Sequence, residues 1–561
     1  MSETRTSPTP ETPAIIAGID ALLEPLNRSD APGLVIGVNR DGKSIYRRGI
    51  GMASLEQGVA NTPHTRMRIA STSKHFTALG VLLLAEQGLL NIDDDARRYL
   101  PELPQLSRTG PSLRQLMNHT GGWRGHDELW LLAHGLAPQP KGLNLPAMAR
   151  QSELNFEPGT QMIYSNGGYH MLAKIIERVS GIGFGQFLKQ RIFDPMGMTD
   201  TESIASDLDI TPRLAGLYMA KPAALGGGWQ RGIYPGDLEG SGSMVSTLDD
   251  MLRWLAHLRS SEKHVGSAGS WKQMLAPATL SSGIVMPYGF GLMRHPYRGV
   301  EVIHHNGAVL GGTSQMITVP AFGLDIMIMA NGAPTSPTLL AFKVIDLLLA
   351  EELTELPEER AAAASYQALV GRRYHSPDSG GVFGFADVAG KLGLSWLESA
   401  AIPMRQREDG LLLSTLDIGI NPIEIDMVGV SLDQAPDTLV LREGGNAQRF
   451  ERLPDAPPDN AALAPVLCGD YFSADLDASA QLAQADGGLL LTVQGKYGRQ
   501  VGRLQALSDK VMTLTSADPL LAALGNSIIL NIEYQEGRVA GLRLESFRTR
   551  HMHFIRKEIT A

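Results

Sequence analysis

STSKHFTALGVLLLAEQGLL, residues 71–90, places a serine and a lysine three positions apart at the start of an apolar segment. The spacing of the apolar residues predicts a helix from Phe76 to Leu90, with Ser71 and Lys74 one turn apart on one face. A serine hydroxyl is a poor nucleophile at neutral pH, and a lysine whose pKa is lowered by burial is a base that activates it. The first N–H groups of the helix also suit a developing oxyanion. The stretch therefore predicts nucleophilic catalysis by Ser71 with Lys74 as its base.

This spacing is a weak signal on its own. A Ser/Thr cluster before an apolar helix is commonly an N-cap. Ser260 and Lys263 have the same spacing inside a polar stretch of this chain. Companion motifs must therefore decide between catalysis and capping.

Two companion motifs follow in the chain. Tyr164-Ser165-Asn166 is the one Tyr-x-Asn sequence among 13 tyrosines. A tyrosine there can relay a proton, and the asparagine amide can hold a substrate carbonyl or the lysine; a buried, hydrogen-bonded tyrosine is the structural alternative. His305-Asn306-Gly307 follows a short strand, where the glycine lets a substrate backbone approach closely. His304 is expected to point to the opposite face of that strand.

The composition excludes several classes of protein. Lys and Arg number 49 against 59 Asp and Glu, a net charge of −10, and no basic block is present, so nucleic acid is not an expected partner. Cys468 is the only cysteine, which excludes disulfide frameworks and thiolate metal sites. His551-Met552-His553 could place two imidazoles on one strand face, but without a His-Glu-x-x-His motif we expect no metal and no cofactor. A small peptide, amide or ester is the expected partner.

The N-terminal segment has acidic residues and prolines where a signal peptide needs a basic start and an apolar run. We expect residues 1–30 to be a disordered leader. The most apolar stretch, Ala78 to Leu90, is interrupted by Glu86 and Gln87 and is shorter than the roughly 18 residues of a membrane span. A cytoplasmic protein with no membrane partner is expected, and a homodimer is left open.

The length of 561 residues predicts more than one domain. Residues 31–355 mix short strand-like runs with long helical ones, which indicates an α/β or α+β domain. After Ser365 the pattern changes to short alternating segments with Gly and Asp turns, typical of antiparallel β structure. Two copies are visible there, with Gly371 and Gly469 offset by 469 − 371 = 98 residues, about the length of an eight-stranded barrel. Two antiparallel β-barrels are therefore expected, over 366–455 and 466–561.

Taken together, the motifs resemble those of a known family. Ser-x-x-Lys, then Tyr-x-Asn, then Lys/His-x-Gly is the signature of the penicillin-recognising serine hydrolases, which include class C β-lactamases, DD-peptidases, D-aminopeptidases and related esterases. The resemblance extends over about Gly33 to Glu352. Further stretches similar to that family are Met117–Gly122, Phe156–Gly159, Gly240–Thr247 and Tyr288–Gly291.

The resemblance implies a β-lactamase/transpeptidase-like catalytic domain and assigns roles to residues. Ser71 would be the acylated nucleophile, Lys74 and Tyr164 would share the base and proton-relay work, and His305 would replace the lysine of the third motif. Asn166 would contact the substrate amide. The N–H groups of Ser71 and of Ala308, after Gly307, would form the oxyanion hole.

The two lipocalin-like barrels are similar to the tail of the D-aminopeptidase branch, in which a loop of the last barrel reaches the active site with acidic character. The matching stretch, Gly495 to Val501, is basic, with Lys496, Tyr497 and Arg499, and in the cleft it would attract a carboxylate rather than an ammonium. The alternative is that this loop faces solvent. The expected function is a serine amidase or peptidase acting on short peptides or amino-acid amides, with D-stereospecificity implied by that branch. An esterase, a linear-peptide hydrolase and a peptide cyclase on the same fold are the alternatives; a β-lactamase, or a binder without catalysis, ranks lower.

Overall fold

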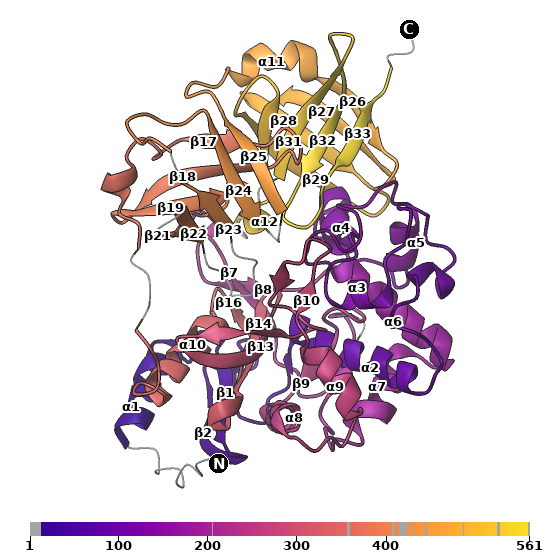
Figure 1. Cartoon of the computed structure of the whole chain (residues 1–561), viewed down its shortest axis with the longest axis vertical. Helices are drawn as coiled ribbons and strands as arrows, with labels where there is room; N and C mark the ends of the chain where they lie inside the picture. The colour runs from indigo at the N-terminus through magenta and orange to yellow at the C-terminus, as the bar shows by residue number, and fades with distance from the viewer. Residues whose placement is uncertain are drawn as a thin grey trace.

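Strands from both ends of residues 34–330 form one six-stranded antiparallel sheet, in the order β12-β13-β14-β15-β1-β2. The computed structural model (Figure 1) describes residues 13–204, 206–355, 360–406, 410–413, 423–428, 430–443, 446–485, 487–523 and 528–558. The strands of this sheet are β1 (Leu34–Arg40), β2 (Lys43–Ile50), β12 (Met293–Tyr297), β13 (Val300–Val309), β14 (Gly312–Val319) and β15 (Leu324–Ala330). Strands β13, β14 and β15 follow one another in the chain and are neighbours in the sheet.

Helices cover both faces of this sheet. Leu34 and Ile36 pack with α10 (Pro337–Leu348), whereas Val35, between them, belongs to the core on the other face, because neighbours on a strand point to opposite sides. That other face is covered by α8 (Leu248–Arg259), beyond which α2 (Lys74–Glu86) packs on α6 (Asn166–Ser180). The shorter helices of this region are α3 (Leu113–Met117), α4 (His126–His134), α5 (Asn144–Ala149), α7 (Phe184–Leu188) and α9 (Ala268–Leu275).

Helix α2 begins earlier and ends earlier than the apolar pattern predicts. Its first residue is Lys74, and a 3-10 turn over Ala70–Ser73 precedes it. It ends at Glu86 because Gly88 adopts a left-handed φ of 70°, and the N–H of Leu89 then bonds back to the carbonyl of Leu84 at 3.1 Å. The nucleophile candidate and its lysine therefore lie in the first turns, where the sequence places them.

The C-terminal region contains two β structures. The last eight strands close into a barrel: β26 (Gly469–Ser473), β27 (Ala478–Ala485), β28 (Gly488–Gln494), β29 (Arg499–Ala506), β30 (Val511–Ser516), β31 (Ile528–Gln535), β32 (Arg538–Glu545) and β33 (Met552–Arg556). The described residues before it form a nine-stranded sheet that is barrel-like and, within those residues, not closed: β17 (Arg373–His375), β18 (Val382–Val388), β19 (Lys391–Trp396), β20 (Ile402–Pro403), β21 (Arg405–Gln406), β22 (Gly410–Leu413), β23 (Ile423–Asp426), β24 (Thr438–Glu443) and β25 (Asn446–Arg452). The predicted fold class is confirmed, with a closed barrel in the second copy and a nearly closed one in the first.

The expectation of a disordered leader over residues 1–30 is wrong for part of that segment. Pro13–Leu23 forms α1, and its Ile19 and Leu23 are buried in the core that α10 shares with the sheet. The apolar residues that do not fit a signal peptide instead cover the end of this core. Residues 1–12 lie outside the described part of the chain.

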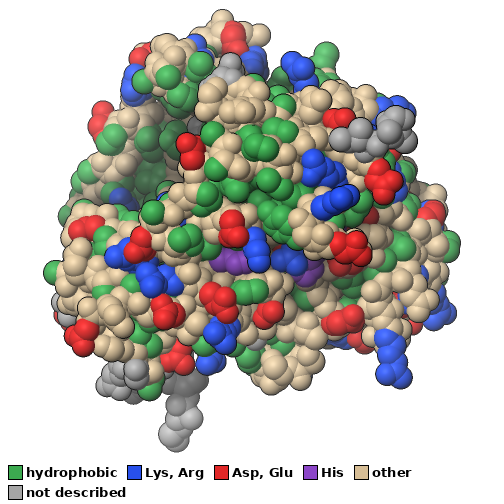
Figure 2. All heavy atoms as spheres, turned by 90° about the horizontal axis from the view of Figure 1, so that it is seen from above, with side chains coloured by type: hydrophobic (Ala, Val, Ile, Leu, Met, Phe, Trp, Pro, Cys, Tyr) green, Lys and Arg blue, Asp and Glu red, His purple; other side chains and the backbone are tan. Residues whose placement is uncertain are grey.

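The surface at the barrel end carries charged side chains of both signs. Figure 2 shows Lys and Arg interspersed with Asp and Glu over this face, around apolar patches. Among the described residues, no helix combines the length and the apolar character that crossing a membrane requires.

Candidate active site

Ser71 lies in the 3-10 turn that leads into α2, directly after a strained residue. Ala70 has a positive φ of 48°, unusual for a residue with a side chain, and its neighbour Ile69 is tied to the carbonyl of Met244. This conformation leads the chain from strand β5 (Met67–Arg68) sharply into the helix. Ser71 is only partly buried, so its hydroxyl remains reachable at the start of α2.

Lys74 is fully buried, and its side-chain nitrogen is surrounded by oxygens. Nζ lies 3.2 Å from Oγ of Ser71, 2.7 Å from Oδ1 of Asn166 and 2.6 Å from the carbonyl oxygen of Ser241. Burial lowers the pKa of Lys74 well below its ordinary value, and the positive charge of Arg548 lowers it further. The structure therefore brings together the serine, the lysine and the asparagine that the sequence singles out.

The ring of Tyr164 packs against the side-chain nitrogen of Lys74. Its ring centre lies 4.8 Å from Nζ of Lys74, and its hydroxyl is buried without a hydrogen-bond partner in the described part of the chain. Burial raises the pKa of Tyr164, with Arg548 opposing that rise. The hydroxyl is thus protonated at neutral pH and available to a substrate atom.

A buried carboxylate, Asp127 at the start of α4, completes this side of the site. Nδ2 of Asn166 donates to Oδ2 of Asp127 at 2.7 Å, and the Tyr234 hydroxyl donates to the same oxygen at 3.2 Å. Burial opposes ionisation of Asp127, but Arg548 and Asn166 together hold its pKa below the ordinary value. Its second oxygen, Oδ1, is buried and has no hydrogen-bond partner among the described residues. The sequence analysis did not single out Asp127.

The third motif is held by a chain of hydrogen bonds. The N–H of Ser165 donates to Nδ1 of His119 at 3.1 Å, so the His119 proton lies on Nε2, 3.1 Å from the Tyr288 hydroxyl. Tyr288 then donates to Nε2 of His305 at 2.9 Å, and Nδ1 of His305 donates to the Asn306 carbonyl at 2.5 Å. Burial lowers the pKa of His305 to about 3, so both rings are neutral. The lone pair of His305 is engaged by Tyr288, whereas Nζ of Lys74 lies within hydrogen-bond distance of Oγ of Ser71.

Strand β13 lies against the nucleophile at the glycine of this motif. A Cβ on Gly307 would lie 2.2 Å from the Ile69 carbonyl oxygen and 3.0 Å from the Ser71 nitrogen, so only glycine fits there. The Ser314 hydroxyl on β14 donates to the same carbonyl at 2.7 Å and lies 2.9 Å from the Thr72 hydroxyl. Ala308 follows Gly307 on this strand, pairing with Thr313 of β14. His304 points away from the site toward His295, as expected from strand alternation.

Arg548 enters the site from the closed barrel and is the main residue that the sequence analysis missed. It lies in the loop between β32 and β33, with its guanidinium carbon 4.7 Å from the centre of the Tyr164 ring. Its Nε lies 3.9 Å from a carboxylate oxygen of Glu128. Asn155 holds this loop, since its Nδ2 donates to the Arg548 carbonyl and its Oδ1 accepts from the N–H of Arg550, both at 2.8 Å.

The basic loop that the sequence pointed to lies elsewhere. The N–H of Gly495 donates to the carbonyl of Ala133 at 2.9 Å, and the Tyr497 ring stacks on Trp130, with 5.5 Å between ring centres. These contacts place Lys496, Tyr497 and Arg499 at the C-terminal half of α4, whereas Asp127 is at its N-terminal end. The described contacts of this loop do not reach Ser71.

This fold and this site define a serine hydrolase of the penicillin-recognising class. A family model described as Beta-lactamase matches residues 19–350, more than half of the chain. The chain belongs to the beta-lactamase family, and the family predicted from the sequence is confirmed.

Relatives extend the likeness beyond this domain. The chain is 27% identical over 491 residues to a D-aminopeptidase of Brucella anthropi, covering 83% of this chain and 84% of that protein. It is 26% identical over 560 residues to a D-aminopeptidase of Cereibacter sphaeroides, covering 96% and 98%. Among solved structures, the octameric penicillin-binding protein homologue from Pyrococcus abyssi matches with a TM-score of 0.55 and 20% identity, over 87% of this chain and 99% of that one. D-amino acid amidase from Ochrobactrum anthropi matches with a TM-score of 0.51 and 24% identity, over 60% and 99%. The two structures support the fold alone.

Proposed function

We propose that this protein is a serine amidase or peptidase that cleaves short peptides or amino-acid amides with a free amino group and a D-residue on the acyl side, through a Ser71 acyl-enzyme. The observation that carries the proposal is the position of Lys74 Nζ, 3.2 Å from Ser71 Oγ in a fully buried setting. The D-preference is taken from the D-aminopeptidases that match this chain over most of its length.

The hydrogen bonds of Lys74 fit a neutral amine. A neutral amine has two N–H donors and one lone pair, and two carbonyl oxygens, of Asn166 and Ser241, stand ready for the donors. The lone pair is then left for the Ser71 proton. Ser71 Oγ attacks the substrate carbonyl as Lys74 takes that proton. When the C–N bond breaks, Tyr164 gives its hydroxyl proton to the leaving amine and regains a proton from Lys74, so that both groups are neutral again in the acyl-enzyme. Water then attacks the acyl-enzyme by the reverse relay.

Strand β13 and the start of α2 would hold the developing oxyanion. The close approach of Gly307 to the Ser71 nitrogen sets the edge of β13 beside the nucleophile. In this proposal the N–H groups of Ser71 and Ala308 donate to the oxyanion. His305 orients the strand through its bonds to Tyr288 and Asn306 rather than acting as a base.

Asp127 is the proposed receptor of the substrate ammonium. Its Oδ1 is buried and unpartnered in the described structure, and its Oδ2 is bonded to Asn166, the residue proposed to contact the substrate amide. A buried carboxylate oxygen without a donor is costly, and an ammonium group satisfies it. The acidic group that the basic loop lacks is thus supplied by α4.

The test compares D- and L-alanine p-nitroanilide, their N-acetylated forms and p-nitrophenyl butyrate. Wild type, Ser71→Ala, Asp127→Asn and, as a matched neighbouring carboxylate, Glu128→Gln are assayed. We expect the free-amine D-substrate to be preferred, Ser71→Ala to be inactive, and Asp127→Asn to raise KM for free-amine substrates tenfold or more while N-acetylated substrates and Glu128→Gln change little. Activity that survives in Ser71→Ala would overturn the nucleophile assignment.

Among the alternatives on this fold, the position of Arg548 favours a linear-peptide hydrolase. Its guanidinium beside Tyr164 suits a carboxylate on the leaving side, and so peptides over simple amides. A preference for esters, or cyclic products from long linear peptides, would replace the amidase proposal with the esterase or cyclase alternative. The cytoplasmic location expected from the sequence stays a proposal, and so does the homodimer that the sequence left open; light scattering on the purified chain measures the oligomeric state.

A further inference from the structure

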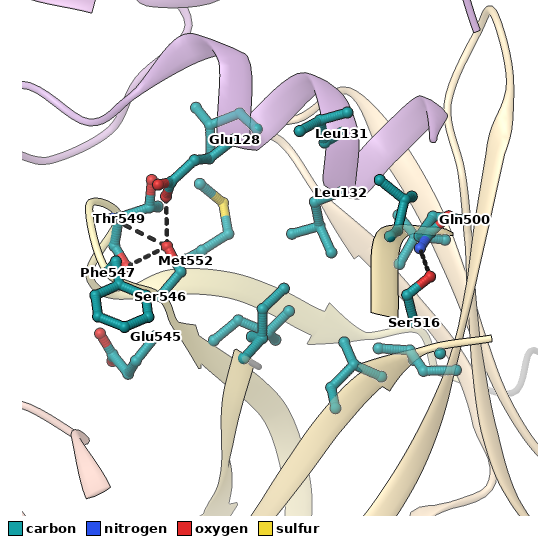
Figure 3. A pocket seen from close by; sticks show the side chains of 18 residues that line it. Glu128, Leu131, Leu132, Gln500, Ser516, Glu545, Ser546, Phe547, Thr549 and Met552 are labelled. Atoms are coloured by element: carbon teal, nitrogen blue, oxygen red, sulfur yellow. Dashed lines mark hydrogen bonds between the residues drawn. The ribbon is translucent and has the colours of Figure 1, made fainter. Parts of the chain in front are cut away.

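A cavity of about 130 Å³ lies between α4 and the closed barrel, separate from the residues around Ser71. Figure 3 shows Leu131 and Leu132 of α4 above it and barrel side chains below it. Most of the lining is aliphatic, contributed by side chains such as Leu491, Val493 and Met552.

Barrel size and lining indicate what could fill this space. An eight-stranded barrel is just wide enough for its own side chains or for one small ligand. Here α4 covers one mouth, and its Leu129, Leu132 and Ala133 join the apolar core of the barrel. A cavity of this volume with largely aliphatic walls has room for an apolar molecule about the size of a benzene ring.

The polar groups at the two ends of the cavity are largely satisfied by one another. Nε2 of Gln500 donates to the Ser516 hydroxyl at 2.5 Å, and the Ser546 hydroxyl donates to a Glu128 carboxylate oxygen at 2.6 Å (Figure 3). The Thr549 hydroxyl is buried and makes no hydrogen bond within the described part of the chain. A second acidic side chain of the lining, Glu545, is ion-paired with Arg543 at 3.0 Å and accepts a hydrogen bond from the N–H of His551 at 2.9 Å. Among the described residues, the walls thus offer a ligand one neutral polar group, and their two carboxylates already have partners. This chemistry excludes charged ligands and allows a single hydroxyl.

The cavity shares two elements with the proposed active site. Glu128 lines the cavity, and the adjacent Asp127 bonds Asn166. Ser546 and Phe547 line the cavity, and Arg548 follows them in the same loop and lies over Tyr164. A molecule that fills the cavity therefore contacts both elements that bring Asp127 and Arg548 to Ser71.

We propose that the barrel cavity is a binding site for a small neutral ligand with an apolar body of about six to eight carbon atoms and at most one hydroxyl group. This site is distinct from the proposed hydrolytic site, and its occupancy is measured without turnover. Failure of the proposed function and failure of this inference are therefore distinguishable.

The first experiment titrates the full chain with toluene and with benzyl alcohol by isothermal titration calorimetry. We expect saturable binding of one molecule per chain. Thr549→Val, which keeps the side-chain shape, should weaken benzyl alcohol about fivefold and leave toluene unchanged. Leu132→Trp fills the cavity and should weaken both probes tenfold or more, whereas Leu208→Trp, at an exposed leucine, should not.

A second measurement locates the ligand and covers the case in which Leu132→Trp does not fold. Crystals of the wild type soaked in bromobenzene should show bromine anomalous signal among Leu132, Leu491 and Met552. Signal only elsewhere, absence of saturable binding to the wild type, or wild-type binding by a folded Leu132→Trp variant would overturn the inference.

Discussion

Substitution of Arg548 provides the most direct test of the proposed chemistry, because the charge of Arg548 lowers the pKa of Lys74, the proposed base, through electrostatic repulsion. Its guanidinium carbon is 4.7 Å from the Tyr164 ring centre and Lys74 Nζ is 4.8 Å from the same point, so the two cations are at most 9.5 Å apart, the sum of these distances. At that separation two unit charges repel by about 1.7 kcal/mol at an effective dielectric of 20 and by about 0.4 kcal/mol in water. The Arg548 side chain is 39% exposed, so an intermediate value of about 1 kcal/mol is appropriate.

Replacing Arg548 by Gln removes this repulsion and raises the pKa of Lys74. Because the proposed base acts when neutral, the acid limb of kcat/KM against pH should move to higher pH, and about 1 kcal/mol of lost repulsion should lower rates on that limb about fivefold. Arg548→Lys keeps the charge and should leave the limb in place, as should Lys496→Gln, which removes a cation from the loop beside Trp130. An acid limb that does not move in Arg548→Gln, or that moves equally in Lys496→Gln, would refute the electrostatic argument.

Three further predictions concern packing and stability. Gly307→Ala should lower kcat about hundredfold, because its Cβ would displace the β13 edge from Ser71; Gly488→Ala, with open space around its Cβ, should have wild-type kcat. Asp475→Asn should lower the free energy of unfolding by about 3 kcal/mol in urea titrations, since it leaves the fully buried Arg124 short of a carboxylate; an unchanged midpoint would contradict this. His553 has a pKa raised to about 9 by the hydrogen bonds that it donates to the carboxylates of Glu153 and Glu533, so its stabilisation is present below pH 6.5 and lost as pH rises through 9. His553→Gln should therefore lower Tm at acidic pH and change it little above pH 9, and the reverse pattern would refute the assignment.

Local patterns predicted the parts of the site that lie close together in the chain. Ser71 and Lys74 are three residues apart on one helix, so their proximity follows from helix geometry. Tyr164, Asn166 and His305 were found through the order of the motifs, although nothing in their spacing gives the distances between them.

The remaining parts of the site depend on tertiary contacts that no local sequence pattern indicates. Arg548 is 384 residues from Tyr164 (548 − 164), in a turn whose neighbours form no motif. Asp127 reads as an ordinary acidic residue in the first turn of a helix. The charge of Lys496 suggested a contact with a substrate carboxylate, but the loop that carries Lys496 packs on Trp130 through Tyr497. In the first β copy, the described strands form a nearly closed barrel-like sheet, and the strand at one end of it, β20, is two residues long and includes Pro403, which has no N–H to donate.

The dependence of the site on the barrel changes how substrate selectivity should be engineered. A directed-evolution library confined to residues 19–350 would hold fixed the loop that carries Arg548 and the wall on which α4 rests. Deleting the tail would expose the leucines of α4 to water and leave the Arg124 guanidinium, now bonded to Asp475 and to the carbonyls of Arg550 and His551, without most of its partners. Useful diversity is therefore expected in residues 546–551, far from the nucleophile along the chain and adjacent to it in space.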